Sequence, residues 1–317
     1  IDVILGYSLI DAGSAMTDTL EITNAVRTER DLTTYAAITD VEKLILTEGS
    51  IAKVTVDDQM EQVILGASAT LELNANGQAV DAEVLAEGEV LTLTDTGAIN
   101  ASVTLTSGDL AASSYSGNLI VTATAGDSSI ITGSGSDRVT AGAGADVIDV
   151  GAGFDTVVLV AGDTVLSMGG SGNSGTIAGY DTVYGFSAAT VSDVSETLDT
   201  AAAASVAGNT TGTNGNDSTL TIGGQTLKSH KTTSGIVTFD DADTYVSALT
   251  LDGSSVAQVA AAVQYLQAQD WGDAGATVAF VTSDATYVFT QGTDDGANAS
   301  DVLVKLVGVY ADSLVTA

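Results

Sequence analysis

Three nine-residue units stand in tandem in the middle of the chain: Thr-Gly-Ser-Gly-Ser-Asp-Arg-Val-Thr (132–140), Ala-Gly-Ala-Gly-Ala-Asp-Val-Ile-Asp (141–149) and Val-Gly-Ala-Gly-Phe-Asp-Thr-Val-Val (150–158). Four columns of this stretch repeat with the same nine-residue step. They are two glycine columns (Gly133, Gly142, Gly151 and Gly135, Gly144, Gly153), an aspartate column (Asp137, Asp146, Asp155) and an apolar column (Val139, Ile148, Val157). Because a merely Gly-rich stretch would not keep four columns in register over three units, the pattern indicates a repetitive fold.

Each unit divides into six residues of turn and three residues of strand, and the apolar member of the strand points inward. The glycines permit backbone conformations with φ > 0 and leave carbonyl oxygens facing into the turn. The aspartate adds a carboxylate at the end of the turn. Stacked turns therefore present an all-oxygen environment, which suits Ca²⁺ and does not favour Zn²⁺. The alternative interpretation is a Gly-rich turn whose aspartates are solvated and hold no ion.

The three units resemble the RTX nonapeptide repeat, whose fold is a two-strand roll with successive turns on opposite edges. This resemblance implies that the predicted ions lie between turns that are two units apart. Asp137 and Asp155 then share one edge and form the best single site. Asp146 lies on the other edge and needs a partner. Asp127 and Asp163 are nearby, but each is one position out of register. We therefore predict one good Ca²⁺ site and one or two degraded ones, with ligands from these aspartates and from the two glycine columns.

The RTX nonapeptide repeat has the pattern Gly-Gly-x-Gly-x-Asp-x-apolar-x, and it folds as a parallel β-roll. The three units depart from this pattern at the first position, where Thr132, Ala141 and Val150 replace glycine. The reduced backbone freedom there predicts weaker binding. The resemblance implies a bacterial protein that is exported by type I secretion with an uncleaved C-terminal signal. The start at Ile1, without a basic-then-apolar leader, agrees with that route and suggests a fragment or processed form.

Residues 1–122 carry short β-type runs at nearly regular spacing, with Asn, Asp, Gly and Ser between them. The clearest runs are Val41–Leu46, Gln62–Leu65, Ala69–Leu73, Glu89–Thr94 and Ala101–Thr106. Alternation with a period of two, punctuated by turn residues, predicts strands. Short strands at this spacing resemble the rungs of a β-solenoid. A conventional β-sandwich is the competing interpretation.

The C-terminal part of the chain predicts a small α+β cap. A helix is expected over Asp252–Gln269, capped by Ser254 or Ser255, with Val256, Val259, Val263 and Leu266 on one face. Three strands should follow, near Thr277–Val281, Thr286–Thr290 and Val302–Val309. Gly179–Val183 repeats the pattern of Gly153–Val157, which predicts a returning rung.

The predicted fold class is mainly β: a β-solenoid or parallel β-roll with a small C-terminal α+β cap. Residues 1–122 form a β-rich domain, solenoid-like or sandwich, and residues 123–200 form the calcium roll with its returning rung. Residues 201–317 form the cap, and its end is similar to C-terminal regions of large type I-secreted surface-layer and adhesin-type proteins. That resemblance implies a type I secretion signal within the cap.

The charge is strongly one-sided, with 41 acidic against 8 basic side chains and a formal net charge of −33. Self-repulsion of this size opposes a compact state unless counterions bind, and Ca²⁺ is a natural counterion for carboxylates. Nucleic acid is not an expected partner, since no basic patch could neutralise phosphates. No apolar run is long enough to predict a membrane helix, so membrane insertion is not expected. The chain also has no cysteine, which removes disulfides and thiolate chemistry.

An enzyme is not expected. His230 is the single histidine and lies in a polar, basic stretch, Lys228–Lys231, which predicts a solvated loop. One histidine is too few for a zincin, and no Gly-x-Ser-x-Gly elbow accompanies it for a Ser-His-Asp triad. A glycosidase-type carboxylate pair stays open among the 41 acidic residues, without an aromatic subsite cluster to support it. Trp271 is expected to anchor the core of the cap rather than to bind a ligand.

The sequence favours a structural subunit of a calcium-stabilised extracellular assembly on the bacterial surface, namely a surface layer, sheath or matrix filament. The expected partner is a second copy of the chain in a lattice or filament, with cell-surface polysaccharide as a further partner. Small residues predominate and aromatic residues make up only 5% of the chain, which provides no aromatic-lined ligand site. The alternative is an adhesin, a carbohydrate- or surface-binding module of a large RTX protein.

Overall fold

The computed structural model of the chain describes strand segments between residues 10 and 94, and then residues 100–105, 108–159, 165–167, 176–186, 197–200, 205–213, 221–222, 225–267, 271, 274–292 and 301–315. The chain divides into two compact units, Ile1–Val157 and Val158–Ala317, which we call the first and the second unit. The chain is mainly β with extensive parallel pairing, as predicted. The predicted division into three segments, with boundaries after residues 122 and 200, stays a prediction.

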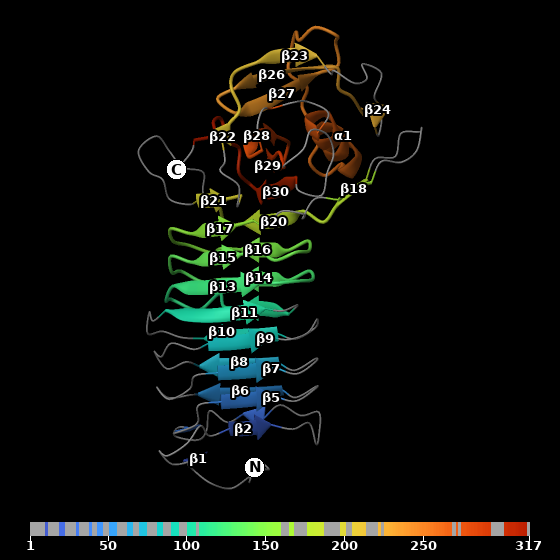
Figure 1. Cartoon of the computed structure of the whole chain (residues 1–317). Helices are drawn as coiled ribbons and strands as arrows, with labels where there is room; N and C mark the ends of the chain where they lie inside the picture. The colour runs from blue at the N-terminus through green and yellow to red at the C-terminus, as the bar shows by residue number, and fades with distance from the viewer. Residues whose placement is uncertain are drawn as a thin grey trace. The chain divides into compact units, whose positions relative to one another are not determined.

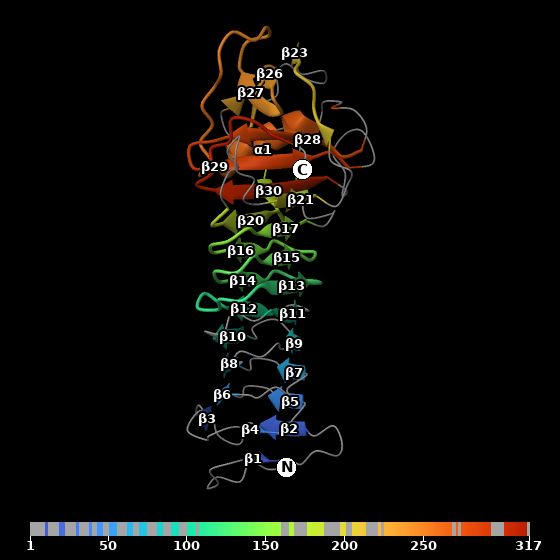
Figure 2. The same cartoon turned by 90° about the vertical axis from the view of Figure 1, so that its left-hand side faces the viewer.

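The first unit is built from short strands. They are β1 (Ile10–Asp11), β2 (Thr19–Ile22), β3 (Arg30–Asp31), β4 (Ile38–Thr39), β5 (Lys43–Leu46), β6 (Ile51–Thr55), β7 (Gln62–Leu65), β8 (Thr70–Asn74), β9 (Asp81–Val84), β10 (Val90–Thr94), β11 (Ala101–Leu105), β12 (Asp109–Ala111), β13 (Leu119–Ala123), β14 (Ser129–Ile131), β15 (Arg138–Thr140), β16 (Val147–Asp149) and β17 (Thr156–Val158). The five runs expected before residue 122 all appear among them. Figures 1 and 2 show these strands stacked as successive rungs.

Alternate strands pair in parallel and form two sheets, in the orders β2-β5-β7-β9-β11-β13-β15-β17 and β3-β6-β8-β10-β12-β14-β16. Val121 of β13 lies opposite Val139 of β15, and Ile130 of β14 lies opposite Ile148 of β16. In the repeats, each rung therefore returns to the same sheet after two nonapeptide units. This arrangement is consistent with a parallel β-roll. The β-sandwich interpretation of residues 1–122 is wrong, because a sandwich is built from antiparallel sheets.

Side chains of both sheets alternate between the interior and the solvent. In β11 and β13 the first, third and fifth residues are buried, whereas the repeat strands β14, β15 and β16 bury chiefly their middle residue. That middle residue is the apolar column of the sequence, and Val139, Ile148 and Val157 are at most 1% exposed. The period-two pattern thus fixes the register, since a slip by one residue would expose the whole apolar column.

The second unit is an α+β arrangement. Its elements are β18 (Val165–Ser167), β19 (Thr176–Ala178), β20 (Asp181–Tyr184), β21 (Thr197–Asp199), β22 (Ser205–Val206), β23 (Thr211–Thr213), β24 (Thr221–Ile222), β25 (Gln225–Thr226), β26 (Ser229–Thr233), β27 (Ile236–Asp240), α1 (Val256–Gln267), β28 (Ala276–Val281), β29 (Ala285–Thr290) and β30 (Val302–Val307). Within this unit the main sheet runs β23-β26-β27-β28-β29-β30-β20. The three strands predicted near the C-terminus are confirmed, and the predicted returning rung forms β20, which pairs in parallel with β30.

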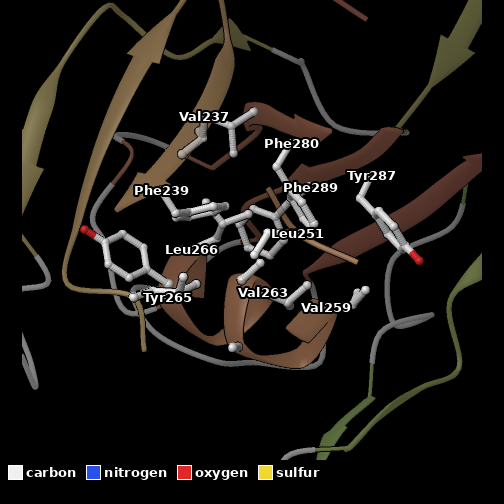
Figure 3. Close-up of a cluster of buried hydrophobic side chains, with 14 of the residues drawn as sticks. Val237, Phe239, Leu251, Val259, Val263, Tyr265, Leu266, Phe280, Tyr287 and Phe289 are labelled. Carbon is white, nitrogen blue, oxygen red and sulfur yellow. The ribbon is translucent and has the colours of Figure 1, made fainter. Parts of the chain in front are cut away.

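Helix α1 packs on an aromatic core. Figure 3 shows Val259, Val263 and Leu266 of α1 among side chains from β27, β28 and β29. The rings of Phe280 and Tyr287 stack in this core, with centroids 5.0 Å apart. Among the residues that the structure describes, no helix is long and apolar enough to cross a membrane.

The helix starts later than predicted. Its first residue is Val256, and the carbonyl of Ser255 accepts the N–H of Val259 at 3.1 Å, which places Ser255 at the cap position. Asp252 lies before the helix and accepts the N–H of Ser254 at 3.0 Å, so it closes a turn instead of starting the helix. Of the four residues predicted to share one face, Val259, Val263 and Leu266 are buried, whereas Val256 in the first turn is 52% exposed.

The predicted solvated loop around His230 is also wrong. His230 lies on β26, is 5% exposed, and its Nδ1 is 2.8 Å from the hydroxyl of Tyr265. The strand alternates, so His230 points inward while Lys231 points to the solvent. The ring of Trp271 lies 5.2 Å from that of His230, and its Nε1 donates to the carbonyl of Leu266 at 2.8 Å. Trp271 thus packs against the core of the second unit, as predicted.

Candidate calcium sites

The turns of the repeats form two edges of the roll. We call the edge with turn residues 113–118, 132–137 and 150–155 the first edge, and the edge with turn residues 124–128 and 141–146 the second edge. On the first edge, the N–H of Ala152 donates to the carbonyl of Gly133 at 3.0 Å. On the second edge, Ala125 and Ala143 form an isolated parallel bridge. Turns that are two nonapeptide units apart therefore stack directly on one another, as predicted.

The glycine columns are needed because the stacked turns approach so closely. A Cβ on Gly151 would lie 2.0 Å from the carbonyl oxygen of Gly133, and its φ of +73° is the left-handed conformation that L side chains avoid. A Cβ on Gly135 would lie 2.2 Å from the carbonyl oxygen of Gly117. The glycines permit positive φ, and half of the members of the two columns adopt it: Gly144, Gly151 and Gly153 do, whereas Gly133, Gly135 and Gly142 do not. At the latter three, close approach alone excludes a side chain.

The aspartate column runs along the interior of each edge. Asp137 and Asp155 are 2% and 1% exposed. Oδ1 of Asp155 accepts the backbone N–H of Asp137 at 2.8 Å, and Oδ1 of Asp137 accepts the N–H of Leu119 at the same distance. Each carboxylate thus reaches back to the turn that lies two units earlier. The structure brings together the pair that the sequence predicted for the best site.

Among the residues that the structure describes, none forms an ion pair with either carboxylate of the first edge. Their second oxygens, Oδ2 of Asp137 and of Asp155, are buried without a hydrogen-bond partner. Burial raises the pKa of Asp155 to about 6, against an opposing hydrogen bond from the N–H of Asp137, and the negative charge of Asp137 raises it further. Burial also raises the pKa of Asp137. Buried anionic oxygens with unused lone pairs, next to stacked backbone carbonyls, are a donor set that fits a hard cation such as Ca²⁺.

On the second edge, Asp146 is fully buried, and its Oδ1 accepts the N–H of Ser128 at 2.8 Å. Asp127 lies on the preceding turn, is exposed, and accepts the N–H of Ala145 at 2.9 Å. Burial raises the pKa of Asp146, and the charge of Asp127 raises it further in spite of the hydrogen bond from Ser128. Asp127 therefore lies beside Asp146, as its near-register position suggested. Asp163 lies outside the described residues.

The residues that replace glycine at the first position have a structural role that the sequence did not indicate. Thr132, Ala141 and Val150 are at most 1% exposed, so they fill the interior of the roll. The hydroxyl of Thr132 donates to the carbonyl of Val150 at 2.7 Å and links the first position of one unit to that of the second unit after it. The departure from glycine thus contributes packing and a hydrogen bond.

Side chains alone do not form a metal cluster here. Within the described part of the chain, no group of three or more His, Cys, Asp or Glu side chains is placed to hold a metal ion. A site at either edge would combine two carboxylates with backbone carbonyls of the glycine turns, as the repeat pattern predicts. The ligand assignments of the individual glycines and aspartates stay predictions.

Parallel rungs of two nonapeptides each, with glycine turns and the buried aspartates Asp137, Asp146 and Asp155, are typical of a parallel β-roll. Residues 122–157 match the family model of the RTX calcium-binding nonapeptide repeat, in four copies. Residues 122–157 of the chain are therefore RTX-type nonapeptide repeats, as their sequence resemblance indicated. No curated protein and no solved structure matches the chain.

The match contains one copy more than the three units read from the sequence. This copy precedes Thr132: Gly126 stands nine residues before Gly135, and Ile130 stands nine residues before Val139. Its aspartate column holds Ser128 instead of aspartate. The glycine and apolar columns were the signal that could have found it, and the interrupted aspartate column is why it was missed.

Proposed function

We propose that the chain is a non-catalytic, structural subunit of a bacterial extracellular assembly, a surface layer, sheath or matrix filament, that is stabilised by Ca²⁺. The observation that carries this proposal is the buried pair Asp137 and Asp155, whose buried Oδ2 atoms have no hydrogen-bond partner. An unpartnered buried polar group costs about 1–3 kcal/mol, and more when charged. A bound cation removes that cost and links folding of the repeat turns to the calcium concentration.

Export and self-association are the further parts of the proposal. RTX repeats are typical of secreted proteins, and millimolar extracellular Ca²⁺ suits modules with a Kd of roughly 10⁻⁴–10⁻³ M. With a net charge of −33, copies of the chain repel one another unless cations lie between them. Ca²⁺ would then act twice, within the roll and between acidic faces of neighbouring copies. A carbohydrate-binding adhesin is the alternative.

The metal site is tested by calorimetric Ca²⁺ titration of the full chain. Asp137→Asn and Asp155→Asn should each abolish the tightest class of sites, because each removes one of the two buried charges. Asp149→Asn is the matched control: it removes one charge from the same repeats, but Asp149 is half-buried at the end of β16, where it accepts the N–H of Gly151. A wild-type titration from Asp155→Asn, or equal losses in the control, would reject the site.

The assembly is tested by electron microscopy of the native protein with Ca²⁺ and after chelation with EGTA. Ordered lattices or filaments that dissolve in EGTA support the structural role. Particles that stay monomeric in millimolar Ca²⁺ and bind on a glycan array favour the adhesin. An assembly that EGTA leaves unchanged contradicts the calcium-stabilised subunit.

A further inference from the structure

The second edge carries a side chain that the repeat pattern does not explain. Ser128 stands in the aspartate column, two units before Asp146, and is 3% exposed. Its N–H donates to Oδ1 of Asp146 at 2.8 Å, so the serine lies directly beside that carboxylate. Its hydroxyl oxygen is buried without a hydrogen-bond partner. A hydroxyl left unpaired in an apolar interior is destabilising, so a serine is unfavourable here unless its hydroxyl binds something.

Ser128 leaves the aspartate column without a negative charge at this position, but the preceding residue, Asp127, carries one. Oδ1 of Asp127 accepts the N–H of Ala145, the residue that precedes Asp146. A Cβ on Gly144 would lie 3.0 Å from the same carboxylate oxygen and 2.5 Å from the carbonyl oxygen of Gly126. Asp127 is therefore held against the next turn of the second edge, with the backbone of Gly126 beside it.

We propose that the second edge binds a Ca²⁺ ion through a substituted ligand set, in which the hydroxyl of Ser128 occupies the place of the column carboxylate and Asp127 supplies the second negative charge from the neighbouring position. This inference rests on the proposed calcium function of the roll and assigns Ser128 as the residue that determines the affinity of this site. The carboxylate of Asp146 is its third oxygen ligand.

The two edges then differ in affinity. The first edge offers two buried carboxylates, whereas the second offers one buried carboxylate, a neutral hydroxyl and an exposed carboxylate. The number of charged ligands and the rigidity of the site tune calcium affinity over several decades. Calcium therefore fills the first edge at lower concentration and the second edge at higher concentration.

The test is a calorimetric Ca²⁺ titration of the full chain, repeated with Tb³⁺ luminescence as a second readout. The wild type should show two classes of sites. Ser128→Ala should remove the weaker class and keep the tighter one, whereas the control Ser129→Ala, which changes an exposed neighbouring serine, should keep both. Ser128→Asp should tighten the weaker class by about tenfold, because it restores the charge of the column.

Asp127→Asn keeps the proposal falsifiable if the buried substitutions impair folding, because Asp127 is exposed. It should weaken the second class selectively. A single class in the wild type, or a second class that survives both Ser128→Ala and Asp127→Asn, overturns the inference. Neither outcome touches the first edge, whose calcium site is tested separately by Asp155→Asn.

Discussion

Asp155 in the first unit and Asp240 in the second unit are both covered aspartates, 1% and 3% exposed, but their pKa values shift in opposite directions. Asp240 accepts the backbone N–H groups of Ser247, Val246 and Ala242, the first at 2.8 Å. These hydrogen bonds, that of Ser247 foremost, lower its pKa to about 2. Burial raises the pKa of Asp155 to about 6, and a single N–H opposes the shift.

The difference shows two ways of covering a carboxylate. The second unit folds its own loop over Asp240 and supplies the donors from its backbone, so that this charge needs nothing from the solution. The first unit provides a hydrogen bond to one oxygen of Asp137 and of Asp155 and leaves the other oxygen to a solute, which we propose is Ca²⁺. The stability of the first unit should therefore depend on the solution far more than that of the second unit.

The largest effect on stability is expected from a glycine-to-alanine substitution in the closely stacked turns of the first unit. The same substitution at an open backbone position of the second unit is its control. Gly151→Ala places a Cβ 2.0 Å from the carbonyl of Gly133 at a φ of +73°. It should destabilise the first unit by more than about 2 kcal/mol even in saturating Ca²⁺, from strain plus separation of the turns. Gly208→Ala is the control, because nothing lies within 4 Å of a Cβ there, and it should change stability by less than about 0.5 kcal/mol. Urea denaturation followed by circular dichroism measures both; equal effects would contradict the stacking.

A smaller effect is expected from acidification of the calcium-free protein. The pKa of Asp155 in the folded protein, about 6, lies above its ordinary value of 3.8. Its charge therefore opposes folding above pH 6, and the free energy of unfolding of the first unit should rise as the pH falls from 7 through 6 toward 4. Thermal melts of metal-free protein across this range measure the trend. Asp155→Asn should flatten it, and an unchanged slope in that variant would contradict the assignment.

The smallest effect has the opposite sign and lies in the second unit. Burial lowers the pKa of His230 below its ordinary value of 6.5. The folded unit keeps His230 neutral while the unfolded chain protonates it, so stability should fall as the pH drops below 6.5. Trp271, the single tryptophan, lies 5.2 Å from the His230 ring and reports on this unit by fluorescence. His230→Gln should remove the pH dependence; a unit that gains stability on acidification would contradict it.

The roll could be predicted because residues at equivalent positions of the repeats have the same environment, so each repeat indicates the structure of the others. Each nonapeptide occupies the same environment as the second one after it, so Gly151, Asp155 and Val157 repeat what Gly133, Asp137 and Val139 require. The pairing of Asp137 with Asp155 followed from this periodicity together with the two-strand roll that the RTX resemblance implies. Strands that share no repeat, such as those of the second unit, could be recognised by alternation but could not be ordered in a sheet.

The misses arise where a residue's environment is set by distant parts of the chain. Basic neighbours made His230 look solvated, whereas its partner Tyr265 lies far along the chain on α1 and could not be inferred. Ser128 interrupts the aspartate column, which is recognised only from the other repeats. In the fold, Ser128 nevertheless lies against Asp146. Local sequence patterns predict which way a side chain points, whereas its contact partners depend on the tertiary structure.

Because each rung of the roll contains two nonapeptides, adding or removing an odd number of nonapeptides has a different effect from adding or removing an even number. Removing one nonapeptide, for example residues 141–149, would move the turn of Asp155 to the opposite edge and stack it on Gly126 and Ser128 instead of Gly133 and Asp137. Removing two would keep every later turn on its own edge. Homologous rolls should therefore gain and lose nonapeptides in pairs. In a chain that gains or loses an odd number of nonapeptides, the ion sites would form between turns that do not stack on one another in this chain.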